Sequence, residues 1–340
     1  MALIFAVAAS LLLSQSAPPT TADGYAAIVD QYIAGDPAGA VKRLAPNSAR
    51  LPGEVVAQAR QFPDRRVRAA VMMHTELAVA WLIAGQVSPA TTQVNNAERL
   101  LSILTDDARR RAGSEAFAIR WTAFVTSVYA GQGLFDQAHR TATTGMSAFP
   151  RAAELLVARG CVFEMRASMY DGTRNERNLR DAGRDRRELD GLREAAARDF
   201  QRAIDIDPAL SNAHLHRGWV HHQLGDSRAA ADLEAALRHA TDDASRYLAH
   251  LFLGMVAEHG NGLDAALSEF EAARAIGPYQ TSYVALSRVE TALGHAERAR
   301  TIAAEFAQLA PTSEDPWWNY RLGGFSSGAL GWLRQEARKP

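Results

Sequence analysis

A recurring order of residue sizes constrains this chain more than any other feature. In the stretch LFLGMVAEHGNGLDAALSEFEAARAIGP, Gly254 lies midway along one expected helix, and Ala266, Phe270 and Ala273 follow at four- and three-residue steps along a second. Those steps place the second set on one helix face. Residues with almost no side chain let two antiparallel helices approach closely, and Phe270 fills the space beside the contact. Pro278 lacks an N–H group and ends the unit.

The same order recurs in three neighbouring stretches. It is found at Ala196, Phe200, Ala203 and Pro208, at Gly218, Ala229, Leu233 and Ala236, and at Gly294, Ala299, Ala303, Phe306 and Pro311. The prolines at 278 and 311 are 33 residues apart, and those at 208 and 278 are 70 apart, which is two periods of about 34 with a small excess. A repeat of this length indicates stacked helix pairs.

These residues resemble the tetratricopeptide repeat (TPR) family. The motif is matched best by Leu253, Gly254, Ala266, Phe270, Ala273 and Pro278, and the family's aromatic positions on the first helix hold His214, His221, His250 and Ala257 instead. The resemblance is strongest over residues 193–311 and extends more weakly over 120–166. It implies an all-α fold, an α-solenoid of stacked antiparallel helix pairs in a right-handed superhelix.

We expect four regions along the chain. They are a signal peptide at 1–16, degenerate N-terminal helical repeats at 23–118, TPR-like repeats at 119–311 with a charged insertion at 171–190, and a C-terminal capping segment at 312–340. The insertion carries six acidic residues and six arginines with almost no apolar residue. Such a segment does not contribute to a core, so it is either a solvated extension of a helix pair, a mobile loop or a docking arm.

The first residues predict export. An apolar run from Ala2 to Leu13 has the length of a signal-peptide core, and Ser14 and Ser16 stand where a cleavage signal is expected. The alternative is a buried first helix. We therefore expect a protein of the periplasm or cell envelope, with no stable membrane span after signal removal, because no later segment is long and apolar enough.

Charge and cysteine content restrict the ligands that we expect. Lys+Arg 37 against Asp+Glu 38 gives a net charge of -1, so we expect no nucleic-acid partner. The only cysteine, Cys161, excludes an intramolecular disulfide and a multi-thiolate metal site, and we interpret it as a small core residue because no histidine stands in an evident pairing context. His214, His216, His221 and His222 are not spaced as metal ligands on one helix face. No metal or cofactor is therefore expected.

The tail concentrates the aromatic residues of the chain. It contains Trp317, Trp318, Tyr320, Phe325 and Trp332, with Leu330 and Leu333 on one side of a short last helix. Repeat arrays need an end unit to cover the last exposed face, so we expect a cap on the preceding pair. The alternative is a patch that docks a partner.

The family resemblance implies a binding surface on the first helix of each pair. Carried over residue by residue, its inward positions are Asn212, Leu215, Trp219, His222, Leu248, Leu251, Met255, Glu258 and His259. The preceding unit adds Glu154, Val157, Cys161, Glu164 and Met165. Protonation of His222 and His259 would tune binding near pH 6 in this scheme.

The predicted function is a non-enzymatic protein–protein interaction scaffold that binds a partner protein or peptide in the concave groove. The sequence contains no HExxH or GxSxG motif. One alternative is a hydrolase or modifying enzyme that uses the repeats as a substrate platform, which requires an acid, a base and a nucleophile to converge in one place. The other is a self-assembling structural array. No sequence feature specifies an oligomeric state or the identity of the partner.

Overall fold

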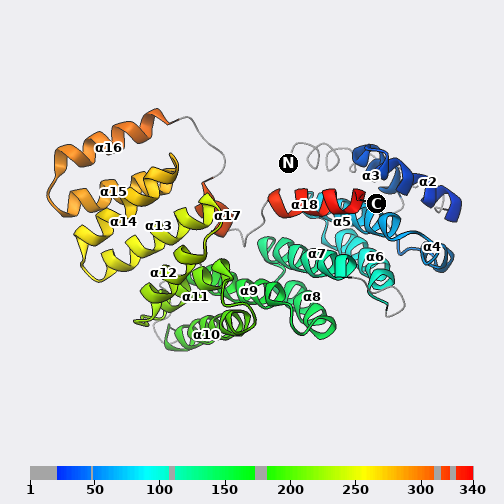
Figure 1. The fold of residues 1–340 in the computed structure, drawn as a ribbon, viewed down its shortest axis with the longest axis horizontal. Coiled ribbons are helices and arrows are strands. Elements are labelled where there is room, and N and C mark those ends of the chain that lie inside the picture. Colours follow the sequence, from blue (N-terminus) through cyan, green and yellow to red (C-terminus); the bar gives the residue numbers. More distant parts are fainter. Residues whose placement is uncertain are drawn as a thin grey trace. The chain divides into compact units, whose positions relative to one another are not determined.

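The chain folds entirely into α-helices over the residues that the structure describes. The computed structural model describes residues 21–46, 49–106, 112–172, 182–309, 315–321 and 327–339, and these ranges contain no strand. The predicted all-α solenoid of helix pairs is confirmed (Figure 1). The expected signal peptide at 1–16 lies outside the described residues. No helix in the described ranges combines the length and the apolar character needed to cross a membrane.

The chain divides into two compact units. The first comprises residues 1–128 with 326–340, and the second comprises residues 129–325. Helices of the first unit are α2 (Ala22–Ile33), α3 (Pro37–Leu44), α4 (Gly53–Ala59), α5 (Asp64–Ile83), α6 (Val87–Thr105), most of α7 (Ala112–Gly131) and α18 (Ser327–Arg338). Helices of the second are α8 (Phe135–Ala148), α9 (Ala153–Gly172), α10 (Ala182–Ile206), α11 (Ser211–Gln223), α12 (Ala229–His239), α13 (Asp243–His259), α14 (Leu263–Ile276), α15 (Gln280–Ala292), α16 (Ala296–Gln308) and α17 (Pro316–Arg321).

The first unit is organised around α5. This helix is buried along most of its length, and α2, α3, α6 and α18 pack against it. Two polar groups in this core are hydrogen-bonded: His74 contacts Tyr25 and Gln93, and Glu76 accepts a hydrogen bond from Tyr32. Pairing of this kind is what allows polar side chains to be buried.

In helix pairs of the second unit, a glycine of one helix packs directly against a large side chain of the other. A Cβ added at Gly254 would lie 2.4 Å from Phe270 Cε1, and Ala266, Phe270 and Ala273 are fully buried. The α9/α10 and α11/α12 pairs repeat this contact, with Gly160 against the Phe200 ring and Gly218 against Leu233. The close approach predicted from the small residues is confirmed.

Most of the tight turns between the helices also repeat. A residue with positive φ follows α2, α5, α7, α11, α13 and α15, namely Gly35, Gly85, Gly133, Gly225, Asn261 and Gly294. This left-handed conformation ends a helix and suits glycine, with asparagine as the common substitute. The repeat therefore includes the turn residues as well as the buried helix faces.

Two parts of the second unit differ from the sequence-based expectation. In α16 the buried face is formed by Ala299 and Ile302, while Ala303 is exposed, so the expected Ala299–Ala303–Phe306 register is wrong. The charged insertion at 171–190 is described only at its ends, which continue α9 to Gly172 and begin α10 at Ala182. Charged residues can continue a helix beyond its partner without entering a core.

The two helices of the tail pack in different places: α17 packs against α13, beside which it lies in Figure 1, and α18 packs against α5. Asp315, at the start of α17, accepts hydrogen bonds from the backbone and hydroxyl of Thr281. Leu330, Leu333 and Ala337 form the buried face of α18. Each helix therefore completes the core of the unit to which it belongs.

Candidate functional site

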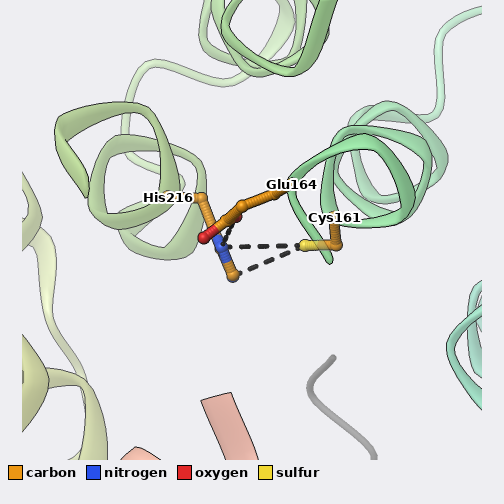
Figure 2. A group of neighbouring side chains, drawn as sticks. All are labelled: Cys161, Glu164 and His216. Carbon is orange, nitrogen blue, oxygen red and sulfur yellow. Dashed lines mark hydrogen bonds and ion pairs between the residues drawn. The ribbon is translucent and has the colours of Figure 1, made fainter. Parts of the chain in front are cut away.

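Three chemically active side chains converge between α9 and α11. Cys161 and Glu164 lie one turn apart on α9, and His216 reaches them from α11 (Figure 2). His216 Nδ1 lies 2.8 Å from Glu164 Oε2, and His216 Nε2 lies 3.5 Å from Cys161 Sγ. Nδ1 also lies 3.7 Å from Cys161 Sγ, so the sulfur is within reach of both ring nitrogens. We call Cys161, Glu164 and His216 the thiol cluster.

The surroundings of the thiol cluster favour a charged imidazole. Burial opposes the charge on His216, but the adjacent Cys161 and Glu164 outweigh it and hold the pKa of His216 well above its usual value. The ring is sandwiched between Phe200, with centroids 5.3 Å apart, and Tyr320 of α17, with centroids 4.7 Å apart. The Tyr320 hydroxyl also donates a hydrogen bond to Glu164 Oε1. Both carboxylate oxygens of Glu164 are therefore used.

A set of aromatic rings lies beside the thiol cluster. Trp219 of α11 stacks on Phe252 of α13, with centroids 4.6 Å apart. Trp317 of α17 meets both rings edge-on, at 6.1 Å from Trp219 and 5.7 Å from Phe252, and Tyr320 lies 4.9 Å from Phe252. We call Trp219, Phe252 and the neighbouring Met255 the aromatic surface. In this structure α17 covers it with two of its own side chains.

Three of the predicted partner-binding residues lie in the core. Leu215, Leu248 and Leu251 are 4%, 8% and 0% exposed and belong to the buried cluster of the second unit. The sequence-based prediction placed them on the binding surface because they occupy the first helix of a pair. In the folded chain these three side chains pack against other buried residues of the second unit.

The other predicted residues surround the aromatic surface or lie on the outside. Asn212 is exposed at the start of α11, Met255 is half-buried, and Glu258 accepts two hydrogen bonds from Arg288 at 2.7 and 2.5 Å. The His222 and His259 rings meet edge-on at 5.3 Å, and burial lowers the pKa of His222, with the charge of His259 contributing. These two histidines are neighbours, and the lowered pKa of His222 opposes its protonation near pH 6.

The residues predicted in the preceding repeat are also partly buried and partly exposed. Glu154 is exposed, Val157 is buried, and Met165 is half-buried, whereas Cys161 and Glu164 enter the thiol cluster. Sequence reasoning placed these two on the correct helix but missed their partner His216.

The interpretation of Cys161 as a cysteine without a histidine partner is wrong. His216 is 55 residues away in the chain, and spacing along one helix does not reveal a partner on another helix. Stacking of α9 on α11 supplies the contact. The useful signal was the repeat itself, because it places consecutive first helices side by side.

Comparison with known proteins concerns the fold. Neither a protein-family model nor a curated protein sequence matches the chain. Solved structures that are similar include MamA, at 17% identity and a TM-score of 0.42 over 58% of this chain and 99% of that chain. TTC0263, a thermophilic TPR protein in Thermus thermophilus, is 20% identical with a TM-score of 0.42, over 66% of this chain and 99% of that chain. A monomeric mutant of IFIT1 with m7Gppp-AAAA is 15% identical with a TM-score of 0.49, over 85% of this chain and 68% of that chain.

The class of the protein follows from the helix pairs. The chain has a TPR-like fold, and the resemblance stated from the sequence is confirmed. One prediction about partners is wrong. The expectation of no nucleic-acid partner is contradicted by IFIT1, which is seen with m7Gppp-AAAA. A net charge of -1 was not a sufficient reason for that expectation.

Proposed function

We propose that this chain is a non-enzymatic scaffold that binds a partner protein through the aromatic surface of α11 and α13. The observation that carries the proposal is the position of α17, which presents Trp317 and Tyr320 to this surface. The partner segment that fits is a short helical turn with two aromatic residues three positions apart. Residues at that spacing share one helix face.

The contacts of α17 define the chemistry that the partner segment would need. Trp317 contributes an edge-on contact with two rings, and aromatic pairs in this arrangement contribute about 0.5–1.5 kcal/mol beyond the area that they bury. Tyr320 adds a hydroxyl donor for Glu164. Trp318 faces away and is 55% exposed. We therefore expect the first and last aromatic positions to determine binding, and the middle one to be neutral.

A peptide with the sequence of residues 313–324 tests the proposal when it is supplied in trans. The receptor is the full chain with Trp317→Ala and Tyr320→Ala, which removes the two side chains that cover the surface. We expect saturable one-to-one binding by isothermal titration calorimetry. A peptide with Trp317→Ala should bind at least about tenfold more weakly, since truncating a central aromatic residue commonly costs about 2 kcal/mol or more.

Two controls make the test specific. A peptide with Trp318→Ala should bind as well as the unchanged peptide, because that side chain is exposed. Trp219→Glu in the receptor should abolish binding while far-ultraviolet circular dichroism stays helical. Absence of saturable binding, or binding that survives Trp219→Glu, would refute the assignment of the aromatic surface.

The thiol cluster supports a second candidate function, that of a modifying enzyme. Its acid–base group and nucleophile converge, since His216 contacts both Cys161 and Glu164. An activated thiol should react with iodoacetamide nearly as fast at about pH 6 as at about pH 8, because it is the thiolate that reacts. His216→Ala should remove this flat profile. A rate that rises steeply with pH in the unchanged protein would eliminate the enzyme candidate.

A further inference from the structure

The thiol cluster brings three different metal-binding groups together from two helices. The sulfur, imidazole nitrogen and carboxylate oxygen of Cys161, His216 and Glu164 all lie within 4.8 Å of one another. In the part of the chain that the structure describes, this is the group in which three such donors meet. Glu164 is buried, and the other two are half-buried, so the cluster lies at the edge of the core (Figure 2).

The distances between the donors suit a tetrahedral ion. Zinc binds sulfur at about 2.3 Å and imidazole nitrogen at about 2.0–2.1 Å, so a tetrahedral angle separates these two donors by about 3.6 Å. Cys161 Sγ lies 3.5 Å from His216 Nε2 and 3.7 Å from Nδ1, so either ring nitrogen stands at about this separation from the sulfur. Glu164 Oε2 lies 2.8 Å from His216 Nδ1 and within 4.8 Å of the sulfur, so it is the third donor of the set.

The chemical nature of the donors selects the ion. Magnesium and calcium prefer sites made of oxygen ligands alone, whereas a thiolate with an imidazole and a carboxylate suits zinc. Three protein ligands leave a fourth position for water or for a ligand. We propose that Cys161, Glu164 and His216 form a Zn²⁺ site between α9 and α11.

Tyr320 is a positioning residue for this site. Its hydroxyl donates to Glu164 Oε1, while the other oxygen, Oε2, faces His216. Hydrogen bonds of this kind hold a ligating carboxylate in place, and their loss typically costs about 10–100-fold in metal affinity. Tyr320 also contacts the aromatic surface, but metal binding can be measured without a partner protein.

A histidine–glutamate contact without a thiol provides a matched comparison. His250 Nδ1 lies 2.8 Å from Glu269 Oε2, the same separation as in the thiol cluster, but among the described residues this pair has no third metal-binding group with it. If the His216–Glu164 contact served only to join two helices, both histidines would respond alike to metal.

Titration of the full chain with Co²⁺ and with Zn²⁺, without any peptide, tests the proposal. We expect one ion per chain and a near-ultraviolet thiolate-to-cobalt charge-transfer band that added Zn²⁺ removes. Cys161→Ser should abolish the band, Glu164→Gln and Tyr320→Phe should weaken binding at least about tenfold, and His250→Ala should leave it unchanged. Circular dichroism checks that each variant is folded.

A second measurement uses the unchanged protein and needs no variant. Zn²⁺ should protect Cys161 from alkylation by iodoacetamide in proportion to site occupancy, and a chelator should restore the reaction. A missing charge-transfer band, a band that survives Cys161→Ser, or alkylation that is insensitive to Zn²⁺ would each overturn the proposal. Failure of the peptide titration would not affect these readouts, so the two proposals can fail separately.

Discussion

The contact between Gly254 and Phe270 offers the sharpest test of how the helix pairs pack. In Gly254→Ala, the new methyl group would lie 2.4 Å from Phe270 Cε1 and 2.6 Å from Cδ1. Real Cβ atoms do not approach other atoms so closely, and Phe270 is fully buried, so its ring cannot swing out into solvent. Either α13 and α14 separate or the ring leaves its preferred rotamer.

The size of the effect follows from two opposing contributions. Forcing an extra methyl group into a packed core costs about 1–3 kcal/mol. Replacing glycine by alanine inside a helix stabilises it by about 0.5–1 kcal/mol. Gly191→Ala in α10 isolates the second contribution, because nothing lies within 4 Å of the added methyl group there. We therefore expect Gly191→Ala to be stabilising and Gly254→Ala to be less stable than Gly191→Ala by about 1–3 kcal/mol.

Urea denaturation followed by far-ultraviolet circular dichroism measures this difference. A smaller side chain at position 270 should relieve the crowding. The double variant Gly254→Ala, Phe270→Leu should therefore lose less stability than the sum of the losses in the two single variants. In another pair Leu233 faces Gly218, and a Cβ added there would still lie 2.8 Å from Leu233 Cγ, so leucine should relieve the crowding only in part. If Gly254→Ala stabilises the protein as much as Gly191→Ala does, the packing explanation is refuted.

Two further predictions concern the first unit. Burial lowers the pKa of His74 to about 4 from 6.5, so the unfolded chain takes up a proton before the folded protein does as the pH falls. Acidification through this window should therefore remove up to about 3 kcal/mol of stability. If the urea midpoint of His74→Gln falls as much as that of the unchanged protein, this explanation is contradicted. Arg334 Nε lies 2.7 Å from Oε1 of the buried Glu76, so Arg334→Ala should cost about 3–5 kcal/mol. Arg300→Ala should cost less than about 1 kcal/mol because its ion pair with Glu297 is exposed. Equal losses of stability in Arg334→Ala and Arg300→Ala would contradict the importance given to the buried Glu76.

The helix pairs could be predicted because their signals are local. Four- and three-residue steps place Ala266, Phe270 and Ala273 on one face whatever lies elsewhere in the chain, and the structure buries all three. The same logic failed at Ala303, because α16 offers fewer neighbouring residues and its face is set by Ile302 instead. Periodicity thus identifies a buried face best where both sides of the helix pair are covered.

The candidate site could not be predicted because its contacts are distant in sequence. Glu164 meets His216 across 52 residues and Tyr320 across 156 residues. The second separation depends on where the tail packs, and no periodic pattern encodes that position. The same packing explains why Leu251 was assigned to a binding surface although it is buried. Motif spacing within one helix cannot detect ligands that two stacked helices share.

The central claim is that α17 rests on α11 and α13 through its aromatic side chains. The most direct measurement is the nuclear Overhauser contact between the ring protons of Tyr320 and His216 in the full chain, assigned by its disappearance in Tyr320→Ala. With ring centroids 4.7 Å apart, a strong cross-peak is expected. If no cross-peak is observed while the protein is folded and both rings are assigned, α17 does not occupy this surface, and the site described above is not formed.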